Sequence, residues 1–170
     1  HASDFVYNTT HDKLGCWTTE FSRKFYEDNG FFLKKGGLEI CRKDDDARWE
    51  ELKRKVSSGK AFGTNVRLIS AAEAKEKFPL LEEDSIRGAM WDPDAGLVTP
   101  RSQDVVSFAV ETAKEKGALK TFTDTPALDF EIEDGKVVGV KTDKGIIKTD
   151  KVVIASGIWG PLMGKKAGVA

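Results

Sequence analysis

The sequence predicts an α/β fold, and three observations support this prediction. Apolar residues recur at helical spacing early in the chain, and short alternating segments bounded by glycine and aspartate follow. A continuous apolar run at residues 152–155 completes the pattern. Alternation is typical of strands with one buried face, whereas a run without alternation is typical of a strand that helices cover on both faces.

Composition and charge exclude two classes of partner, nucleic acids and membranes. Hydrophobic residues make up 39% and charged residues 32% of the 170-residue chain, as in ordinary globular proteins. The 27 basic and 28 acidic side chains nearly cancel, which argues against nucleic-acid binding. The longest apolar stretch is far shorter than the roughly 20 residues that cross a bilayer. Cys16 and Cys41 lack the spacing of a metal site or disulfide framework, which favours an intracellular protein with packed thiols.

An amphipathic helix is predicted over residues 12–29, with Gly30 as its stop. Four large apolar residues recur at helical spacing, and we expect this stripe to pack in the core: Leu14, Trp17, Phe21 and Phe25. The segments 31–34 and 38–42 flank the pair Gly36-Gly37. This pattern predicts two strands joined by a tight turn into an antiparallel ribbon.

Two further helices and a strand are predicted next. The aspartate pair at 44–45 offers an N-cap for a helix that ends near residues 57–59. Residues 66–69 predict a strand. Ser70 and Glu73 then have the spacing of a capping box, which predicts a short helix.

The second half of the chain is predicted to contain one more helix and then strands. A strand over 86–91 is followed by turn residues, and Thr99 as cap with Pro100 at the first position predicts a helix that stops at Gly117. Five strands are predicted beyond it, at 120–123, 127–132, 137–142, 146–148 and 152–155. Turn signals join the middle three into an antiparallel meander, whereas the last strand is expected in a buried parallel sheet.

Five segments occur in an order that resembles one protein family. They are residues 36–40, 68–74 with 78–81, 93–98, 135–142 and 152–159, with the sequences GGLEI, LISAAEA with FPLL, PDAGLV, GKVVGVKT and VVIASGIW. Together they resemble the D-amino-acid-oxidase-like flavoprotein superfamily. Within it, the dimethylglycine and sarcosine dehydrogenase or oxidase branch is the most similar, and the resemblance covers almost the whole chain.

The resemblance implies part of a two-lobe flavoprotein. Residues 1–30 would be an FAD-lobe segment, 31–99 part of an α+β substrate lobe, and 100–170 part of a Rossmann-like FAD lobe with a β-meander. The chain begins at His1 rather than Met and contains no GxGxxG after a strand, the motif that binds the FAD pyrophosphate at a helix N-terminus. We therefore expect an internal fragment of a longer protein, located in the cytoplasm or the mitochondrial matrix.

Cofactor-binding candidates lie at the bend that follows residues 152–155. Small residues at the carboxyl end of a buried strand let a nucleotide approach the backbone, although a plain strand-to-loop turn is the alternative. The resemblance implies that this bend lies beside FAD. His1-Ala2 is similar to the family's His-Ala pair, where FAD is attached covalently through the histidine; a tag remnant is the alternative. The cofactor-binding candidates are His1, Ala127, Ala155, Ser156, Gly157 and Trp159.

The reaction implied by the resemblance is oxidation of a secondary or tertiary amine such as dimethylglycine or sarcosine, with hydride transfer to the flavin. Trp91 stands where dimethylglycine oxidases have a histidine near the substrate, and a core tryptophan is the alternative. Tyr7 and Arg87 are further substrate-binding candidates, and no catalytic or metal-binding residue is assigned. An N-methylated amino acid and an electron-transfer flavoprotein are the implied partners. Two alternatives stay open: a flavoprotein acting on a hydroxy acid or glycerol phosphate, and a non-catalytic regulatory or partner-binding relative.

Overall fold

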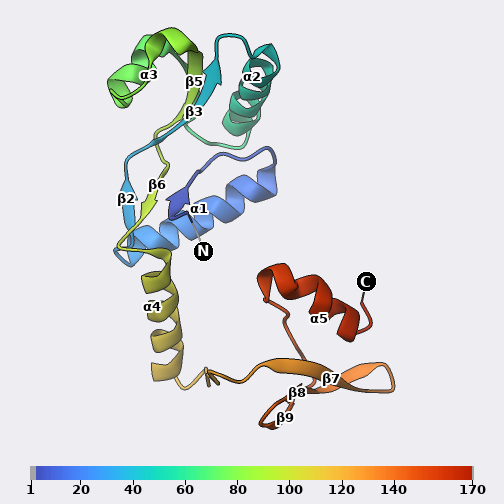
Figure 1. The fold of residues 1–170 in the computed structure, drawn as a ribbon. Coiled ribbons are helices and arrows are strands. Elements are labelled where there is room, and N and C mark those ends of the chain that lie inside the picture. Colours follow the sequence, from blue (N-terminus) through green and yellow to red (C-terminus); the bar gives the residue numbers. More distant parts are fainter. Residues whose placement is uncertain (1–2, 170) are drawn as a thin grey trace. The chain divides into compact units, whose positions relative to one another are not determined.

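The computed structural model describes residues 3–169 (Figure 1). The chain divides into two compact units, His1–Lys116 and Gly117–Ala170. The first unit contains two three-stranded sheets and the second contains one, within the described residues. The assignment of residues 1–30, 31–99 and 100–170 to lobes stays a prediction. No helix in the described part of the chain is long and apolar enough to cross a membrane.

One sheet of the first unit lies between two helices. Its antiparallel strands, in spatial order, are β3 (Gly37–Arg42), β5 (Ile86–Asp92) and β4 (Arg67–Ser70). The helices α2 (Asp46–Ala61) and α3 (Ala71–Lys77) lie on opposite sides of β3 and β5 (Figure 1). Neighbouring residues of the central strand enter different cores, because successive side chains of a strand point to opposite faces. Met90 packs with Leu52 and Val56 of α2, whereas Ala89 packs with Ala74 of α3.

Local capping signals determine where these two helices begin. The carboxylate of Asp45 accepts a hydrogen bond from the backbone N–H of Arg48 at 2.8 Å, which confirms the predicted cap of α2. The capping box between Ser70 and Glu73 at the start of α3 is also confirmed. The predicted end of α2 near residues 57–59 is wrong, because the helix continues to Ala61. Gly59 is instead a close-packing position: a Cβ there would lie 2.6 Å from Thr64 Oγ1.

The second sheet of the first unit contradicts the predicted ribbon. Its antiparallel strands are β1 (Phe5–Val6), β6 (Gly96–Val98) and β2 (Phe32–Lys34), with β6 in the centre. β2 therefore pairs with β6, and β3 pairs with β5, so the two segments around Gly36 do not pair with each other. Gly36 has φ of +76°, and its N–H donates to the Ala95 carbonyl at 2.8 Å. This hydrogen bond to a residue distant in sequence holds Gly36 at the point where the chain passes from one sheet to the other. The chain therefore does not fold back into a hairpin there.

Helix α1 (Lys13–Asp28) forms as predicted, with Asp12 as its cap, but its apolar stripe is not in the core. Leu14, Trp17 and Phe21 are 68%, 62% and 66% exposed, and the buried residue of the helix is Cys16. The Trp17 and Phe21 rings stack on each other at 5.8 Å. The prediction was wrong for these three residues, because the helix packs through a narrow polar face. Phe25, the last residue of the stripe, packs against the Phe108 ring at 6.4 Å.

The start of helix α4 (Ser102–Glu115) also differs from the prediction. Thr99 and Pro100 precede the helix, which has no side-chain cap from its own flank. The N–H of Ser102 instead donates to the carboxylate of Asp4 at 2.8 Å, so the cap comes from the other end of the first unit. Gly117 has φ of +68° just beyond the helix, in agreement with the predicted stop.

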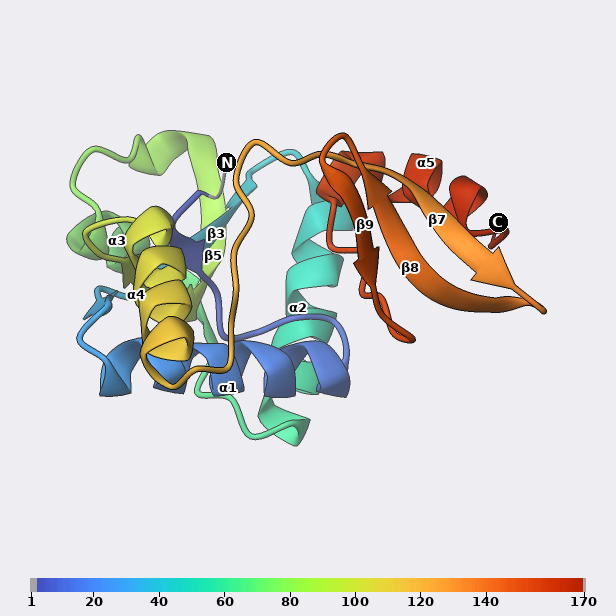
Figure 2. The ribbon, with the colours of Figure 1, turned by 90° about the horizontal axis from the view of Figure 1, so that it is seen from below.

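The second unit contains the predicted meander, β7 (Ala127–Glu133), β8 (Lys136–Thr142) and β9 (Gly145–Lys148), followed by the single turn η2 (Gly157–Trp159) and α5 (Gly160–Lys166) (Figure 2). Asp134 and Gly135 have positive φ in the first hairpin turn, as a two-residue hairpin requires. The predicted strands at 120–123 and 152–155 do not form. The 152–155 segment has no strand partner among the described residues, since the sheet of this unit consists of β7, β8 and β9, and Val153 is 90% exposed.

Candidate functional site

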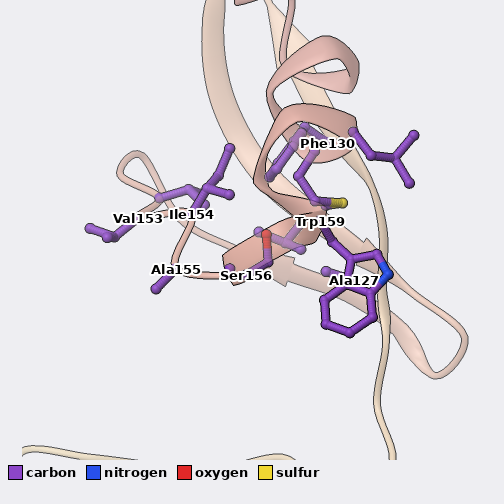
Figure 3. Close-up of a pocket in the computed structure, with 12 residues that line it drawn as sticks. Ala127, Phe130, Val153, Ile154, Ala155, Ser156 and Trp159 are labelled. Carbon is purple, nitrogen blue, oxygen red and sulfur yellow. The ribbon is translucent and has the colours of Figure 1, made fainter. Parts of the chain in front are cut away.

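An open hollow of about 810 Å³ lies within the second unit, between the meander, the 152–157 segment and the η2–α5 region (Figure 3). Five of the six predicted cofactor-binding residues line it. The sixth, His1, lies outside the described residues. The lining residues are Ala127, Phe130, Val140, Val152, Val153, Ile154, Ala155, Ser156, Gly157, Trp159, Leu162 and Met163.

The backbone at the bend leaves room for a ligand. Gly157 has φ of +56°, a conformation that side-chain-bearing residues rarely adopt, and no atom lies within 4 Å of the place where a Cβ would be. Gly157 therefore presents backbone to the hollow, and its neighbours Ala155 and Ser156 carry only small side chains. Trp159 and Ala127 line the hollow nearby, as the close-up shows (Figure 3).

The chemistry of the lining fits part of FAD. The hydroxyl oxygen of Ser156 is buried and has no hydrogen-bond partner among the described residues. A buried hydroxyl without a partner costs free energy, so a polar group bound there would stabilise it. The remaining lining side chains are carbon-rich, as suits the planar rings of a nucleotide cofactor. Phe130, Leu162 and Met163 also belong to this lining; sequence reasoning missed them because apolar residues on a strand or helix read as core.

Tyr7, a predicted substrate-binding residue, is fixed by the fold of the first unit. Its hydroxyl donates to the Leu38 carbonyl at 2.7 Å, and its ring packs edge-on against Phe5 at 4.6 Å. Burial, with a smaller effect of the nearby Glu39 carboxylate, raises the pKa of Tyr7 to about 12. Tyr7 is therefore a neutral phenol at physiological pH, and its hydroxyl proton is engaged by the protein itself.

Trp91 and Arg87, the other two candidates, lie on different faces of the β3–β5–β4 sheet. Trp91 is partly buried and packs against the core cluster on the α3 side, where the Lys77 ammonium lies 4.4 Å from its ring centre. Arg87 points to the α2 side, where it pairs with Asp46 at 2.5 Å and lies over the Trp49 ring. The structure thus separates Arg87 from Trp91. It brings Tyr7 close to Trp91, because Leu38, which accepts the Tyr7 hydrogen bond, is the strand partner of Trp91.

The small-residue bend and the meander together line a hollow whose size and lining are typical of a protein that binds a nucleotide cofactor. The chain belongs to the FAD dependent oxidoreductase family (DAO), whose profile matches residues 6–169. This match confirms the family that the five sequence segments indicated.

Three proteins illustrate what the chain is similar to. It is 31% identical to the mitochondrial sarcosine dehydrogenase of Homo sapiens over 87% of this chain and 16% of that protein. It is 27% identical to the mitochondrial pyruvate dehydrogenase phosphatase regulatory subunit of Mus musculus over 93% of this chain and 18% of that protein. The crystal structure of L-proline dehydrogenase from P. horikoshii superposes with a TM-score of 0.84 and 35% identity, covering 96% of this chain and 44% of that one. The chain thus spans less than half the length of each.

Proposed function

We propose that this chain is part of an FAD-dependent enzyme that oxidises secondary or tertiary amino acids such as sarcosine and dimethylglycine. The observation that carries the proposal is the hollow at Ser156 and Gly157, which five predicted cofactor-binding residues line. The amine class rests on the similar proteins: sarcosine and L-proline, the substrates that two of them are named for, are both secondary amino acids.

Bound FAD would supply the acceptor for a hydride from the carbon next to the substrate nitrogen, which leaves the substrate as an iminium. The residues of this chain would hold the cofactor. The Ser156 hydroxyl would exchange a hydrogen bond with it, Gly157 would let it approach the backbone, and Trp159 would pack against a ring. Covalent attachment through His1 is part of the same proposal.

On the substrate side, Trp91 would provide an apolar wall for N-methyl groups, and Tyr7 would hold the adjoining backbone in place through its bond to Leu38. We assign no substrate role to Arg87, because Asp46 and Trp49 hold it on the other face of the sheet. An electron-transfer flavoprotein as electron acceptor and a mitochondrial location belong to the proposal; the human sarcosine dehydrogenase is mitochondrial by name.

A second candidate function is regulatory. The mouse regulatory subunit shares 27% identity over 93% of this chain, so a protein with this sequence pattern can be named for regulation rather than catalysis. The hollow would then hold a structural cofactor, or its apolar lining would be covered by another protein segment.

Anaerobic flavin reduction tests the proposal in the longest protein that the gene encodes. We expect sarcosine, dimethylglycine or L-proline to bleach the flavin absorption, and glycine to do so much more slowly. Bleaching by glycerol phosphate or a hydroxy acid alone would move the protein to another substrate class. Bound flavin that none of these compounds reduces would favour the regulatory function.

A further inference from the structure

A second hollow, of about 470 Å³, surrounds the indole of Trp91 within the first unit. We call it the Trp91 hollow. Its lining includes Phe5, Lys35, Gly36, Leu38, Lys77 and Trp91. These residues come from β1, the β2–β3 link, β3, α3 and β5, so the hollow forms only when both sheets of the first unit are in place.

The position of the Trp91 ring is fixed by a close contact with backbone. A Cβ added at Gly36 would lie 1.9 Å from the Cη2 atom of Trp91, so the indole occupies the space that a side chain at residue 36 would need. The Lys77 ammonium lies over the same ring, 4.4 Å from its centre. A ring held in this way is a preformed apolar surface with a cation over one of its faces.

The charge of the Trp91 hollow is positive. Lys35 and Lys77 line it, and none of the described residues that line it is acidic. Neither lysine forms an ion pair within the described part of the chain, whereas the neighbouring Lys34 pairs with Asp94 at 2.5 Å. Lys75, two residues before Lys77 on α3, donates to the Leu81 carbonyl at 3.1 Å. Among these lysines, Lys35 and Lys77 have ammonium groups free to meet an anion.

A cationic ligand would be repelled here, because Lys77 already makes the cation–π contact that Trp91 can offer. An anionic group attached to an apolar body would be bound by two favourable interactions. Its charge would pair with Lys77, and its body would cover the carbon surfaces of Trp91, Phe5 and Leu38.

We propose that the Trp91 hollow binds a carboxylate with an apolar body, held by Lys77 through an ion pair and by Trp91 and Phe5 through apolar contact. Lys77 is then the residue that selects an anionic ligand. The assignment of this carboxylate to the amino-acid substrate rests on the proposed function, whereas the binding of a carboxylate does not.

The test is a titration of the 170-residue chain, kept dilute enough to stay monomeric and followed by two-dimensional amide NMR, with three ligands of similar shape: benzoate, benzamide and benzylammonium. We expect benzoate to shift the Gly36 and Gly37 amides and the Trp91 indole N–H, and to bind about five-fold more tightly than benzamide, as a partly exposed ion pair would give. Benzylammonium should bind more weakly than benzamide. Equal binding of the three ligands, or no benzoate shift at these residues, would overturn the proposal.

Lysine-to-glutamine variants identify which ammonium group binds the carboxylate. Lys77→Gln keeps most of the length of the side chain and removes its charge, so the preference for benzoate over benzamide should disappear. Lys60→Gln is the matched control, because Lys60 is also an exposed lysine in the last turn of its helix, α2, and it does not line the hollow. A preference that survives in Lys77→Gln but is lost in Lys35→Gln would move the anchor to Lys35 and contradict the role of Lys77. Flavin content and flavin reduction, measured separately, report on the proposed function, so either proposal can fail alone.

Discussion

The carboxylate of Asp92 accepts a hydrogen bond from the backbone N–H of Asn8 at 3.0 Å, across 84 residues of sequence. Asp92 is fully buried, and its other oxygen accepts from the N–H of Asp94 at 3.1 Å. Asp92 therefore fastens the N-terminal segment to the turn after β5. The same segment is fastened at Asp4, whose carboxylate caps α4 through Ser102. These two aspartates position Phe5 beside β6 and Tyr7 beside β3.

Asp92→Asn should destabilise the chain, because an amide can place only one acceptor oxygen where the carboxylate has two. One buried N–H would lose its partner, at a cost of about 1–3 kcal/mol in the free energy of unfolding. Urea unfolding of the variant and the wild type measures this difference. Asp44→Asn is the control: Asp44 is an exposed partner of Arg42, and its replacement should change stability by less than about 0.5 kcal/mol. Equal stability of Asp92→Asn and wild type would contradict the role of Asp92.

The pH dependence of this difference has a definite sign. Burial raises the pKa of Asp92 above its ordinary value of 3.8. The folded chain then keeps a proton at pH values where the unfolded chain has lost it, so the stabilising contribution of Asp92 is largest below the ordinary pKa and falls as pH rises through the folded pKa. The excess stability of wild type over Asp92→Asn should therefore decrease from acid toward neutral pH. An increase over that range would show that the folded pKa is lowered instead.

The contact between Gly36 and Trp91 predicts a large effect for a small substitution. Gly36→Ala combines a positive φ with a Cβ 1.9 Å from the indole, and it should destabilise the chain by about 2–4 kcal/mol. Gly63→Ala is the matched control, since Gly63 has φ of +88° but no atom within 4 Å of its Cβ position. It should cost only the backbone strain, about 1–2 kcal/mol. Thermal unfolding of both variants separates the two effects; equal losses would mean that the indole moves freely.

The comparison of sequence and structure shows which signals are local. The caps at Asp45 and Ser70 and the Asp134-Gly135 turn are encoded within four residues, and all three were predicted. The switch of sheets at Gly36 depends on the Ala95 carbonyl, and the cap of α4 depends on Asp4. These long-range partners leave no trace in a local pattern, which is why the ribbon and the Thr99 cap were predicted wrongly.

The candidate site also shows what a local sequence pattern cannot reveal. Ala155, Ser156, Gly157 and Trp159 were predicted together with Ala127, and the structure brings all five to one hollow. Periodicity could not tell that Phe130 lines a hollow, because a strand residue that faces a hollow alternates like one that faces the core. It also could not tell which face of α1 is covered, since an amphipathic pattern marks an apolar face without naming what packs on it.

The exposed stripe of α1 predicts self-association of the isolated 170-residue chain. Trp17 and Phe21 present two stacked rings to solvent, next to Leu14, which is a large apolar patch for one helix. Sedimentation should show concentration-dependent association that Phe21→Lys reduces without lowering stability, because Phe21 is exposed. Lys24→Gln, on the same helix, should leave association unchanged. A chain that stays monomeric at high concentration would show that the patch is too small to drive contact.

Removing the buried hydroxyl of Ser156 should leave the stability of the cofactor-free chain equal or higher, but it should lower the affinity for FAD. Without FAD, Ser156→Ala removes an unpartnered polar atom, and stability should stay equal or rise by up to about 1 kcal/mol. With FAD in the longest protein that the gene encodes, the same variant should lose about five-fold in FAD affinity, because a hydrogen bond is lost. Equilibrium dialysis measures that affinity. Ser107→Ala, at an exposed position of α4, is the control and should change neither quantity. Unchanged FAD affinity in Ser156→Ala would remove Ser156 from the cofactor site.

The covalent link to flavin that the family resemblance implies for His1 predicts a fluorescent protein band. An imidazole nitrogen bonded to the flavin ring survives denaturation, whereas bound but unattached FAD is released. Denaturing gel electrophoresis of the longest protein that the gene encodes should therefore show flavin fluorescence in the protein band. His1→Ala should abolish this fluorescence. His11→Ala is the matched control, because His11 is the only other histidine of the chain and its imidazole lies 3.5 Å from the Glu51 carboxylate. A dark band in the wild type, with free FAD in the supernatant, would exclude covalent attachment while leaving the proposed cofactor hollow at Ser156 untouched.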